Sequence, residues 1–304
     1  MDITDNDTPQ VLRRVDVRVP LHVPVRGIPL RSATLVKGTM GWGESSPLPG
    51  YPVAAANCDR AAIEAAVLGL PDTTRRSIAV NALIPEENPA EAADHARRAV
   101  AEGFGTLKLK VGDDDEVERV AAVRHAVGDE IAIRLDANGL WPVEQARDRV
   151  QRLAQFDPEY IEEPVHGLER LAQLRNDVTV KIAADESVRS IEDAQRLATL
   201  EAVDVLVVKV QACGGALAAI RWAQLAEVPT VVTSMIETSV GLAAGIAAAA
   251  AMPELPYACG LGTGTLLAGD VATDPLLPEG GMVAVRRPEP DEDLLARYAI
   301  EGPK

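Results

Sequence analysis

Charged side chains recur at the ends of five successive segments that are predicted to be strands. These segments are short and apolar, and helix-like stretches rich in Ala, Arg and Glu separate them. From the second lysine onward the charged positions lie 23 to 26 residues apart, which is about one strand plus one helix. In a barrel of parallel strands, this spacing places all the charges around one mouth. The residues are Lys108, Lys110, Asp136, Glu162, Asp185 and Lys209.

Three of these residues are carboxylates on consecutive strands: Asp136, Glu162 and Asp185. In a shared cleft they would repel one another strongly without a cation between them. Oxygen ligands with positions left open for water and substrate suit Mg²⁺. Taken singly, the two aspartates could instead cap the following helices and Glu162 could pair with a base, but all three at this spacing favour a metal site. Spacing alone does not decide between Glu162 and its neighbour Glu163, which point to opposite faces.

The lysines supply the groups for proton transfer. Lys108 and Lys110 are two residues apart on one strand, so they share a face and should lower each other's pKa, which would favour a neutral amine base. Alone, such a pair is more often a solvated strand face. Lys209 lies in the apolar segment VLVVKV, where a buried lysine needs a partner or a task. The Cys213-Gly214-Gly215 turn that follows opens a helix whose N-terminus could hold an anion, and we interpret Cys213 as a structural thiol.

The elements that position these residues repeat along the chain. Strand-like segments begin near residues 77, 106, 132, 160, 181, 205, 229 and 257, with Ala-, Arg- and Glu-rich stretches between them. Eight evenly spaced strand–helix units predict an α/β fold of the TIM-barrel type. A doubly wound open sheet is the alternative. We expect residues 76–270 to form the barrel, residues 1–75 to form a separate α+β domain of short antiparallel strands, and the tail 271–304 to return and complete that domain.

The composition of the chain limits the classes of molecule that it is expected to bind. The chain of 304 residues has a formal net charge of −16 and a pI near 4.7, which argues against nucleic-acid and anionic membrane partners. A small carboxylate substrate stays compatible, because lysines and a metal invert the field within a cleft. Three cysteines suit buried free thiols. The first ten residues carry no signal-peptide pattern, so we expect a cytoplasmic protein. The oligomeric state is left open.

The ordered motifs resemble those of the enolase superfamily, in its muconate-lactonizing-enzyme subgroup. The similarity covers residues 14 to 270 and includes a segment typical of that subgroup's N-terminal capping domain. A set of five ordered barrel motifs is highly specific. The motifs are GWGESSPLPGY at 41–51, TLKLKV at 106, RLDANGLW at 134, YIEEPV at 160, AADES at 183 and VKVQACGG at 208.

The resemblance implies a (β/α)₇β barrel with an α+β capping domain over its mouth. It also implies that Mg²⁺ binds to three acids, and it selects Glu162 over Glu163. Lys110 would be the acid/base, Lys108 would tune and orient it, and Lys209 would lie on the opposite face of the substrate. Enzymes of this superfamily take a proton beside a carboxylate and stabilise the resulting charge with the metal. The implied Mg²⁺ ligands are Asp136, Glu162 and Asp185.

Within the subgroup, the chain is most similar to the o-succinylbenzoate synthase family of menaquinone biosynthesis. The capping domain is short, PVRGIPLR at 24–31 resembles a capping-loop segment of that family, and KVQACGG is of its type. In such an enzyme Lys209 would face the ring through a cation–π contact, and Arg26 would be a substrate-loop candidate, although an exposed structural arginine is an equal alternative. An N-succinylamino-acid racemase would use the same residues. A muconate-type cycloisomerase and a non-catalytic metal- or anion-binding barrel are more distant alternatives.

Further substrate contacts are expected near the last two strands. The segment TSMIETS carries Ser234 and Ser239 and lacks the histidine base of mandelate racemases. The segment GLGTG lacks the Asp-x-Asp pair of dipeptide epimerases, and its Gly262 and Gly264 could bring backbone N–H groups to a substrate carboxylate; tight packing at the barrel rim is an equal alternative. Asn138 shares a strand face with Asp136 and is expected to support the metal site from behind.

Overall fold

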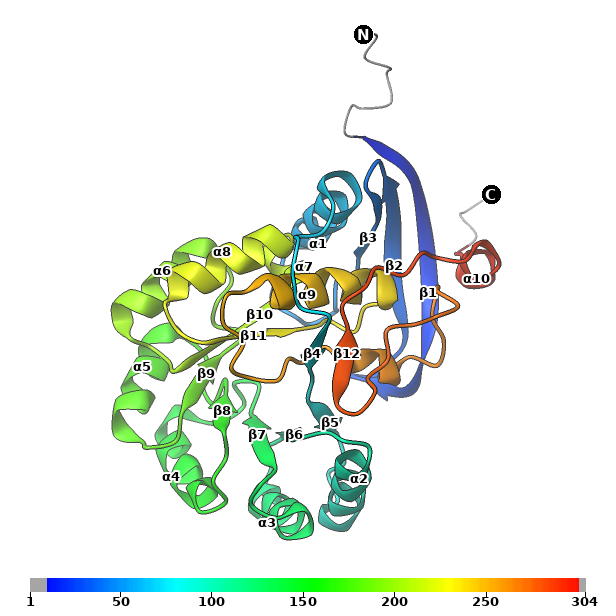
Figure 1. The fold of residues 1–304 in the computed structure, drawn as a ribbon. Coiled ribbons are helices and arrows are strands. Elements are labelled where there is room, and N and C mark those ends of the chain that lie inside the picture. Colours follow the sequence, from blue (N-terminus) through cyan, green and yellow to red (C-terminus); the bar gives the residue numbers. More distant parts are fainter. Residues whose placement is uncertain (1–9, 301–304) are drawn as a thin grey trace.

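The N-terminal part of the protein is a small antiparallel sheet backed by a helix (Figure 1). The structure is a computed structural model that describes residues 10–300. Strands β1 (Val11–Val25), β2 (Ile28–Gly38) and β3 (Gly41–Ser45) pair in sequence order. Helix α1 (Ala55–Ile63) runs on into a π-helical turn, η2 (Glu64–Leu68). It packs so closely on β3 that a Cβ on Gly43 would lie 2.0 Å from a helix carbonyl oxygen, which only glycine avoids.

The larger part is a curled sheet of seven parallel strands in the order β11-β10-β9-β8-β7-β6-β5. Each strand leads into a helix on the outside of the curl (Figure 1), as right-handed crossovers require. The strands are β5 (Ala82–Ile84), β6 (Thr106–Lys110), β7 (Ala132–Asp136), β8 (Tyr160–Glu162), β9 (Ile182–Ala184), β10 (Val205–Lys209) and β11 (Thr230–Thr233). The helices are α2 (Pro89–Ala101), α3 (Glu116–Val127), α4 (Val143–Ala154), α5 (Leu168–Asp177), α6 (Ile191–Leu200), α7 (Val210–Cys213), α8 (Ala216–Ala226) and α9 (Ser239–Ala251).

The predicted eighth strand is reduced to two isolated bridges. Cys259 pairs in parallel with Val80 just before β5, and Gly260 pairs in parallel with Thr233 at the end of β11. The segment around residue 259 therefore touches both sides of the gap in the sheet. The prediction of a full strand from residue 257 is wrong. Prolines at 253 and 256 and glycines at 260 and 262 explain the difference, because proline lacks the N–H that a ladder needs and glycine weakens a strand.

The last described segments of the chain contact both parts of the molecule. Strand β12 (Met282–Ala284) pairs antiparallel with β4 (Ser77–Ala79), at the start of the parallel part. After it, α10 (Glu292–Tyr298) packs on β1, and Leu295 joins Val17 and Val19 in one apolar cluster. Figure 1 shows α10 beside the antiparallel sheet. The outer ends of the expected domain ranges, 1–9 and 301–304, lie outside the described residues.

A buried carboxylate joins the antiparallel sheet to the parallel part. Glu44 in β3 accepts hydrogen bonds from the backbone N–H groups of Thr238 (3.0 Å) and Gly241 (2.9 Å) in the first turn of α9. It also accepts from the hydroxyls of Ser46 and Thr238. A helix N-terminus leaves N–H groups unsatisfied and carries partial positive charge, so the carboxyl oxygens of Glu44 complement both features, while burial raises the Glu44 pKa to about 7. The guanidinium of buried Arg31 also donates hydrogen bonds to the backbone carbonyls of Ile236 and Ser46.

Replacing Glu44 with alanine should destabilise the protein by about 3 kcal/mol, because four buried donors lose their acceptor at once. Urea unfolding of Glu44→Ala measures the change. The exposed Glu254→Ala variant is the control and should change the free energy of unfolding by less than about 0.5 kcal/mol. Equal, small effects for both variants would contradict the role given to Glu44.

Candidate active site

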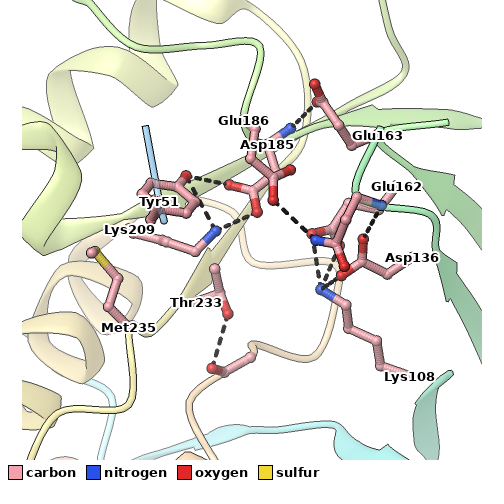
Figure 2. A network of polar contacts seen from close by, with 12 residues as sticks. Tyr51, Lys108, Asp136, Glu162, Glu163, Asp185, Glu186, Lys209, Thr233 and Met235 are labelled. Carbon is pink, nitrogen blue, oxygen red and sulfur yellow. Dashed lines mark hydrogen bonds and ion pairs between the residues drawn. The ribbon is translucent and has the colours of Figure 1, made fainter. Parts of the chain in front are cut away.

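The strand register brings the predicted charged residues together at one end of the parallel sheet. Lys110 pairs with Asp136 across β6 and β7, and Asp136 pairs with Glu162 across β7 and β8. Asp185 directly follows β9, and Lys209 ends β10. The three carboxylate residues are at most 4% exposed. Figure 2 shows Lys108 with Asp136 and Glu162 on one side of the site, and Lys209 with Asp185 on the other.

The two lysines of β6 are held by acids. Lys108 Nζ donates to both carboxylate oxygens of Glu162 at 2.8 Å and lies 3.0 Å from Asp136 Oδ2. Lys110 Nζ donates to Asp136 Oδ2 at 2.6 Å and to Asn138 Oδ1 at 2.7 Å. Both ammonium groups therefore share Asp136. Asn138 in turn donates to Glu186, so it links β6 to the segment that follows β9.

The expected lowering of the lysine pKa is not found for Lys108. Burial acts to lower its pKa, but the negative charges of Asp136 and Glu162 outweigh burial and raise the pKa above its ordinary value. The prediction considered only the neighbouring ammonium group. The structure adds two acids in direct contact with Lys108, at 2.8 and 3.0 Å, whose charges raise its pKa.

Lys209 occupies the opposite side of the cluster. Its Nζ donates to Asp185 Oδ2 and lies 4.5 Å from the ring centre of Tyr51, to whose hydroxyl it also donates. Burial lowers the Lys209 pKa, while the charges of Asp185 and Glu186 outweigh this and raise it. Tyr51 donates its hydroxyl to Asp185 Oδ1 at 2.7 Å. The buried lysine of the apolar strand thus has an acid and an aromatic ring as partners.

The donor set fits a hard divalent cation. The three acids provide only oxygen ligands and come from consecutive strand ends. Within residues 10–300, no three His, Cys, Asp or Glu side chains are grouped closely enough to hold a metal ion; the carboxylates of the three acids bind lysines instead. Burial, followed by the charge of Asp136, raises the Glu162 pKa to about 8. Burial and the neighbouring acid thus both disfavour the charged form of Glu162, and a bound cation would act in the opposite direction.

Two residues at the site were missed from the sequence. Glu186 is almost fully buried, and one of its carboxylate oxygens has no hydrogen-bond partner among the described residues. Its position directly after Asp185 was a usable signal. Tyr51 ends the predicted capping-domain motif, but its contact with Asp185 spans 134 positions of sequence, so no local pattern reveals it. Glu163, the residue after Glu162, faces away from Lys108, and its carboxylate accepts a hydrogen bond from the backbone N–H of Asp185.

Arg26 reaches the site from the turn between β1 and β2. Its guanidinium lies 3.7 Å from the Glu186 carboxylate, and its backbone has a positive φ of 52°. The side chain is 37% exposed, so it stands at the edge of the site and faces solvent on one side. This position connects the antiparallel sheet with the mouth of the parallel one.

Four residues were expected to contact the substrate: two serines, whose hydroxyls are hydrogen-bonded within the protein, and two glycines, which are tightly packed. The Ser234 hydroxyl follows β11 and pairs with the Thr263 hydroxyl. The Ser239 hydroxyl is fully buried, donates to Asp270 and accepts from the Leu276 N–H, which favours a structural role. Gly262 and Gly264 flank the start of η3 (Thr263–Leu266) and pack tightly, because a Cβ would meet Pro278 at 3.2 Å and the Leu276 carbonyl at 2.9 Å respectively.

Comparison with known proteins places the chain in a family. Residues 91–290 match the family described as "Enolase C-terminal domain-like", and residues 16–66 match "Enolase N-terminal domain-like". The chain belongs to the enolase superfamily. Enzymes of this superfamily use a divalent metal ion, in agreement with the donor set described above. None of the helices within residues 10–300 is long and apolar enough to cross a membrane.

Relatives within the superfamily are similar over nearly the whole chain. The o-succinylbenzoate synthase of Thermobifida fusca is 46% identical, over 93% of this chain and 90% of that protein. The o-succinylbenzoate synthase of Mycolicibacterium smegmatis is 40% identical, over 97% and 92%. Among solved structures, muconate lactonizing enzyme from Pseudomonas putida superposes with a TM-score of 0.87 at 22% identity, over 96% of this chain and 99% of that one. The fold is therefore that of muconate lactonizing enzyme, with a curled parallel sheet and an N-terminal capping domain.

Mg²⁺ should raise the midpoint of thermal unfolding, because a ligand that binds only the folded state stabilises it, by about 2–3 kcal/mol at one hundred times its dissociation constant. The Glu162→Gln variant lacks one of the proposed ligands and should lose most of the gain with Mg²⁺, measured against the same variant in EDTA. Differential scanning calorimetry measures both.

The matched control is Glu159→Gln, at the other end of β8. Glu159 also pairs with a buried cation, the guanidinium of Arg134, and this variant should keep the full gain with Mg²⁺. A gain that survives in Glu162→Gln would place the metal elsewhere.

Proposed function

We propose that the protein is a Mg²⁺-dependent o-succinylbenzoate synthase, a carbon–oxygen lyase. It removes water from 2-succinyl-6-hydroxy-2,4-cyclohexadiene-1-carboxylate and forms 2-succinylbenzoate for menaquinone biosynthesis. The observation that carries the proposal is the buried cluster of three acids with lysines from two opposite sides, in a chain 46% identical to a synthase of that name. The cluster spans the ends of β6 to β10, and the similarity covers 93% of the chain.

Asp136, Glu162 and Asp185 are the proposed metal ligands. When bound, the cation supplies positive charge that offsets the three acids and the second negative charge that forms on the substrate carboxylate after proton removal. Asn138 and Glu186 orient the surrounding groups through the hydrogen bond between them. The burial of the ligands excludes water, which strengthens each electrostatic interaction in the site.

Lys110 is the proposed acid and base. Its neutral amine takes the proton from the carbon beside the substrate carboxylate, and the resulting ammonium returns a proton to the hydroxyl that leaves as water. The amine is thereby regenerated, and the product ring becomes aromatic, which supplies much of the driving force. Asn138 holds Lys110 Nζ at 2.7 Å and so fixes its direction. Lys108, bound by Glu162 and Asp136, keeps a positive charge behind the base.

Lys209 provides a second charge on the far side of the substrate. Its ammonium is held by Asp185 and already lies against one aromatic ring, that of Tyr51, and a substrate ring offers the same kind of contact. Arg26 stands at the edge of the site and is the proposed substrate contact from the capping domain, with Ser234, Gly262 and Gly264 as further contacts near the last strands.

We propose two further features of the architecture. The segment around residue 259 closes the curled sheet into a complete (β/α)₇β barrel, supported by its parallel bridges to Val80 and Thr233. The capping domain comprises residues 1–75 together with the tail 271–304, and residues 76–270 form the barrel. The packing of α10 on β1 supports this division.

Replacing Lys110 with alanine should abolish dehydration, with kcat falling at least about 10³-fold, because general acid–base catalysis alone contributes a factor of this order. The purified protein with Mg²⁺ is mixed with the diene, and product is followed by ultraviolet absorbance; EDTA should stop the reaction. The control is Lys181→Ala, a lysine that pairs with Tyr257 far from the acids and should keep wild-type kcat. Full activity in Lys110→Ala would overturn the proposed role.

N-succinylamino-acid racemisation is the second candidate. The observation in its favour is that lysines enter the acid cluster from β6 and from β10, as two bases on opposite faces of one carbon require. A racemase needs proton transfer at both lysines, whereas the dehydration needs it only at Lys110.

Lys209→Arg therefore discriminates between the two reactions. Arginine keeps the positive charge but cannot act as a base. For a synthase, Lys209→Arg should retain at least tenfold more activity than Lys110→Arg, whereas for a racemase both should be equally inactive. Each variant is assayed with the diene and with N-succinylphenylalanine. Faster racemisation than dehydration by the wild-type protein would favour the second candidate.

A further inference from the structure

Helix α3 begins with two charged residues that are buried outside the acid–lysine cluster. Glu116 is 0% exposed and Arg119 is 2% exposed. Burying charged groups costs several kcal/mol each unless their hydrogen bonds are satisfied, and an apolar pair would pack α3 on the sheet at least as well. The partners of these two residues therefore indicate what the charges are used for.

Arg119 binds the backbone of Lys110 itself. Its Nη2 donates to the Lys110 carbonyl at 3.0 Å and to Asp113 Oδ2 at 2.7 Å. Its Nη1 donates to the Glu87 carbonyl at 2.9 Å, in the segment that follows β5. One guanidinium thus joins the ends of β5 and β6, and the planar fork of arginine suits this use because it presents several donors in fixed directions.

Glu116 makes the corresponding link to the other neighbour of β6. It accepts from the Gly112 N–H at 3.0 Å, two residues after Lys110, and from Trp141 Nε1 at 3.1 Å. Arg149 of α4 completes its partners at 2.9 Å. Trp141 lies in the segment after β7, which also carries Asn138, the side chain that accepts from Lys110 Nζ. Glu116 therefore ties the backbone just after Lys110 to the segment that orients its amine.

We propose that Glu116 and Arg119 are positioning residues for Lys110. Together they fix the end of β6 against both neighbouring strands, so that the amine reaches the substrate carbon at the correct distance. The inference rests on the proposed function of Lys110. A misplacement of about 1 Å can lower a rate by about 10²-fold. The need to place the Lys110 amine accurately therefore accounts for the charges buried at this point.

The test compares Arg119→Met with Arg119→Lys in the full-length, Mg²⁺-loaded protein. Methionine removes all donors, whereas lysine can still reach the Lys110 carbonyl but cannot also bind Glu87 and Asp113. We expect kcat for the diene to fall by about 10- to 100-fold in Arg119→Met, with KM changed less than about threefold, and to fall less in Arg119→Lys. Steady-state kinetics and thermal unfolding are measured on each variant.

Arg175→Met is the matched control. Arg175 likewise binds an aspartate, Asp204 at 2.8 Å, and a backbone carbonyl, that of Glu201 at 2.9 Å. Its partner Asp204 precedes β10, at the opposite end from Lys209, so the variant should lose stability and keep its kcat. An equal kcat for Arg119→Met and the wild type, or an equal fall in Arg119→Met and Arg175→Met, would overturn the proposal.

Glu116→Gln decides the question if Arg119→Met does not fold. It preserves shape and removes the charge, and it should lower kcat more than KM, as Arg119→Met does; an unchanged kcat overturns the proposal. A wild-type protein that does not turn over the diene would contradict the proposed function instead. The same variants are then compared in racemisation of N-succinylphenylalanine, which also requires Lys110.

Discussion

Three buried carboxylates at neighbouring strand ends set the main constraint on this structure. Their mutual repulsion in a region that excludes water must be offset by positive charge. In the structure this charge comes from Lys108, Lys110 and Lys209, which bind oxygens of the three proposed metal ligands. Under the proposed function, lysines and metal would therefore act on one set of acids, and a bound cation would take over part of the compensation that the lysines supply.

The charged residues of the site could be predicted because each is tied to the strand period. The carboxyl ends of parallel strands lie at one edge of the sheet, so spacing predicted that Asp136, Glu162 and Asp185 lie at one edge, and the motif selected Glu162 over Glu163. The electrostatics were not accessible in this way. The Lys108 pKa depends on which neighbour is nearest, and spacing along one strand showed only Lys110, not the acids across the sheet.

Contacts between the two parts of the molecule were also beyond local patterns. Tyr51 meets Asp185, and Glu44 meets the first turn of α9, across 134 and 194 residues respectively. Hydrophobic period and turn residues report only on neighbours in sequence. The prediction of the eighth strand was wrong for a different reason. Its spacing was regular, but proline and glycine within the segment limit its pairing to Cys259 and Gly260. Period predicts where a strand should lie, and backbone chemistry decides how much of it forms.

The last described helix and strand of the chain lie beside segments from its first 80 residues. Strand β12 pairs with β4, and Leu295 of α10 packs with Val17 and Val19 on the apolar face of β1. β1 ends at Val25 and α10 begins at Glu292, so β1 is synthesised 267 residues before this helix, and domains generally fold as units while the chain grows. The apolar face of the nascent antiparallel sheet therefore stays exposed until the later segments are synthesised. Chaperones that bind exposed apolar surfaces have a long time to bind this part of the molecule.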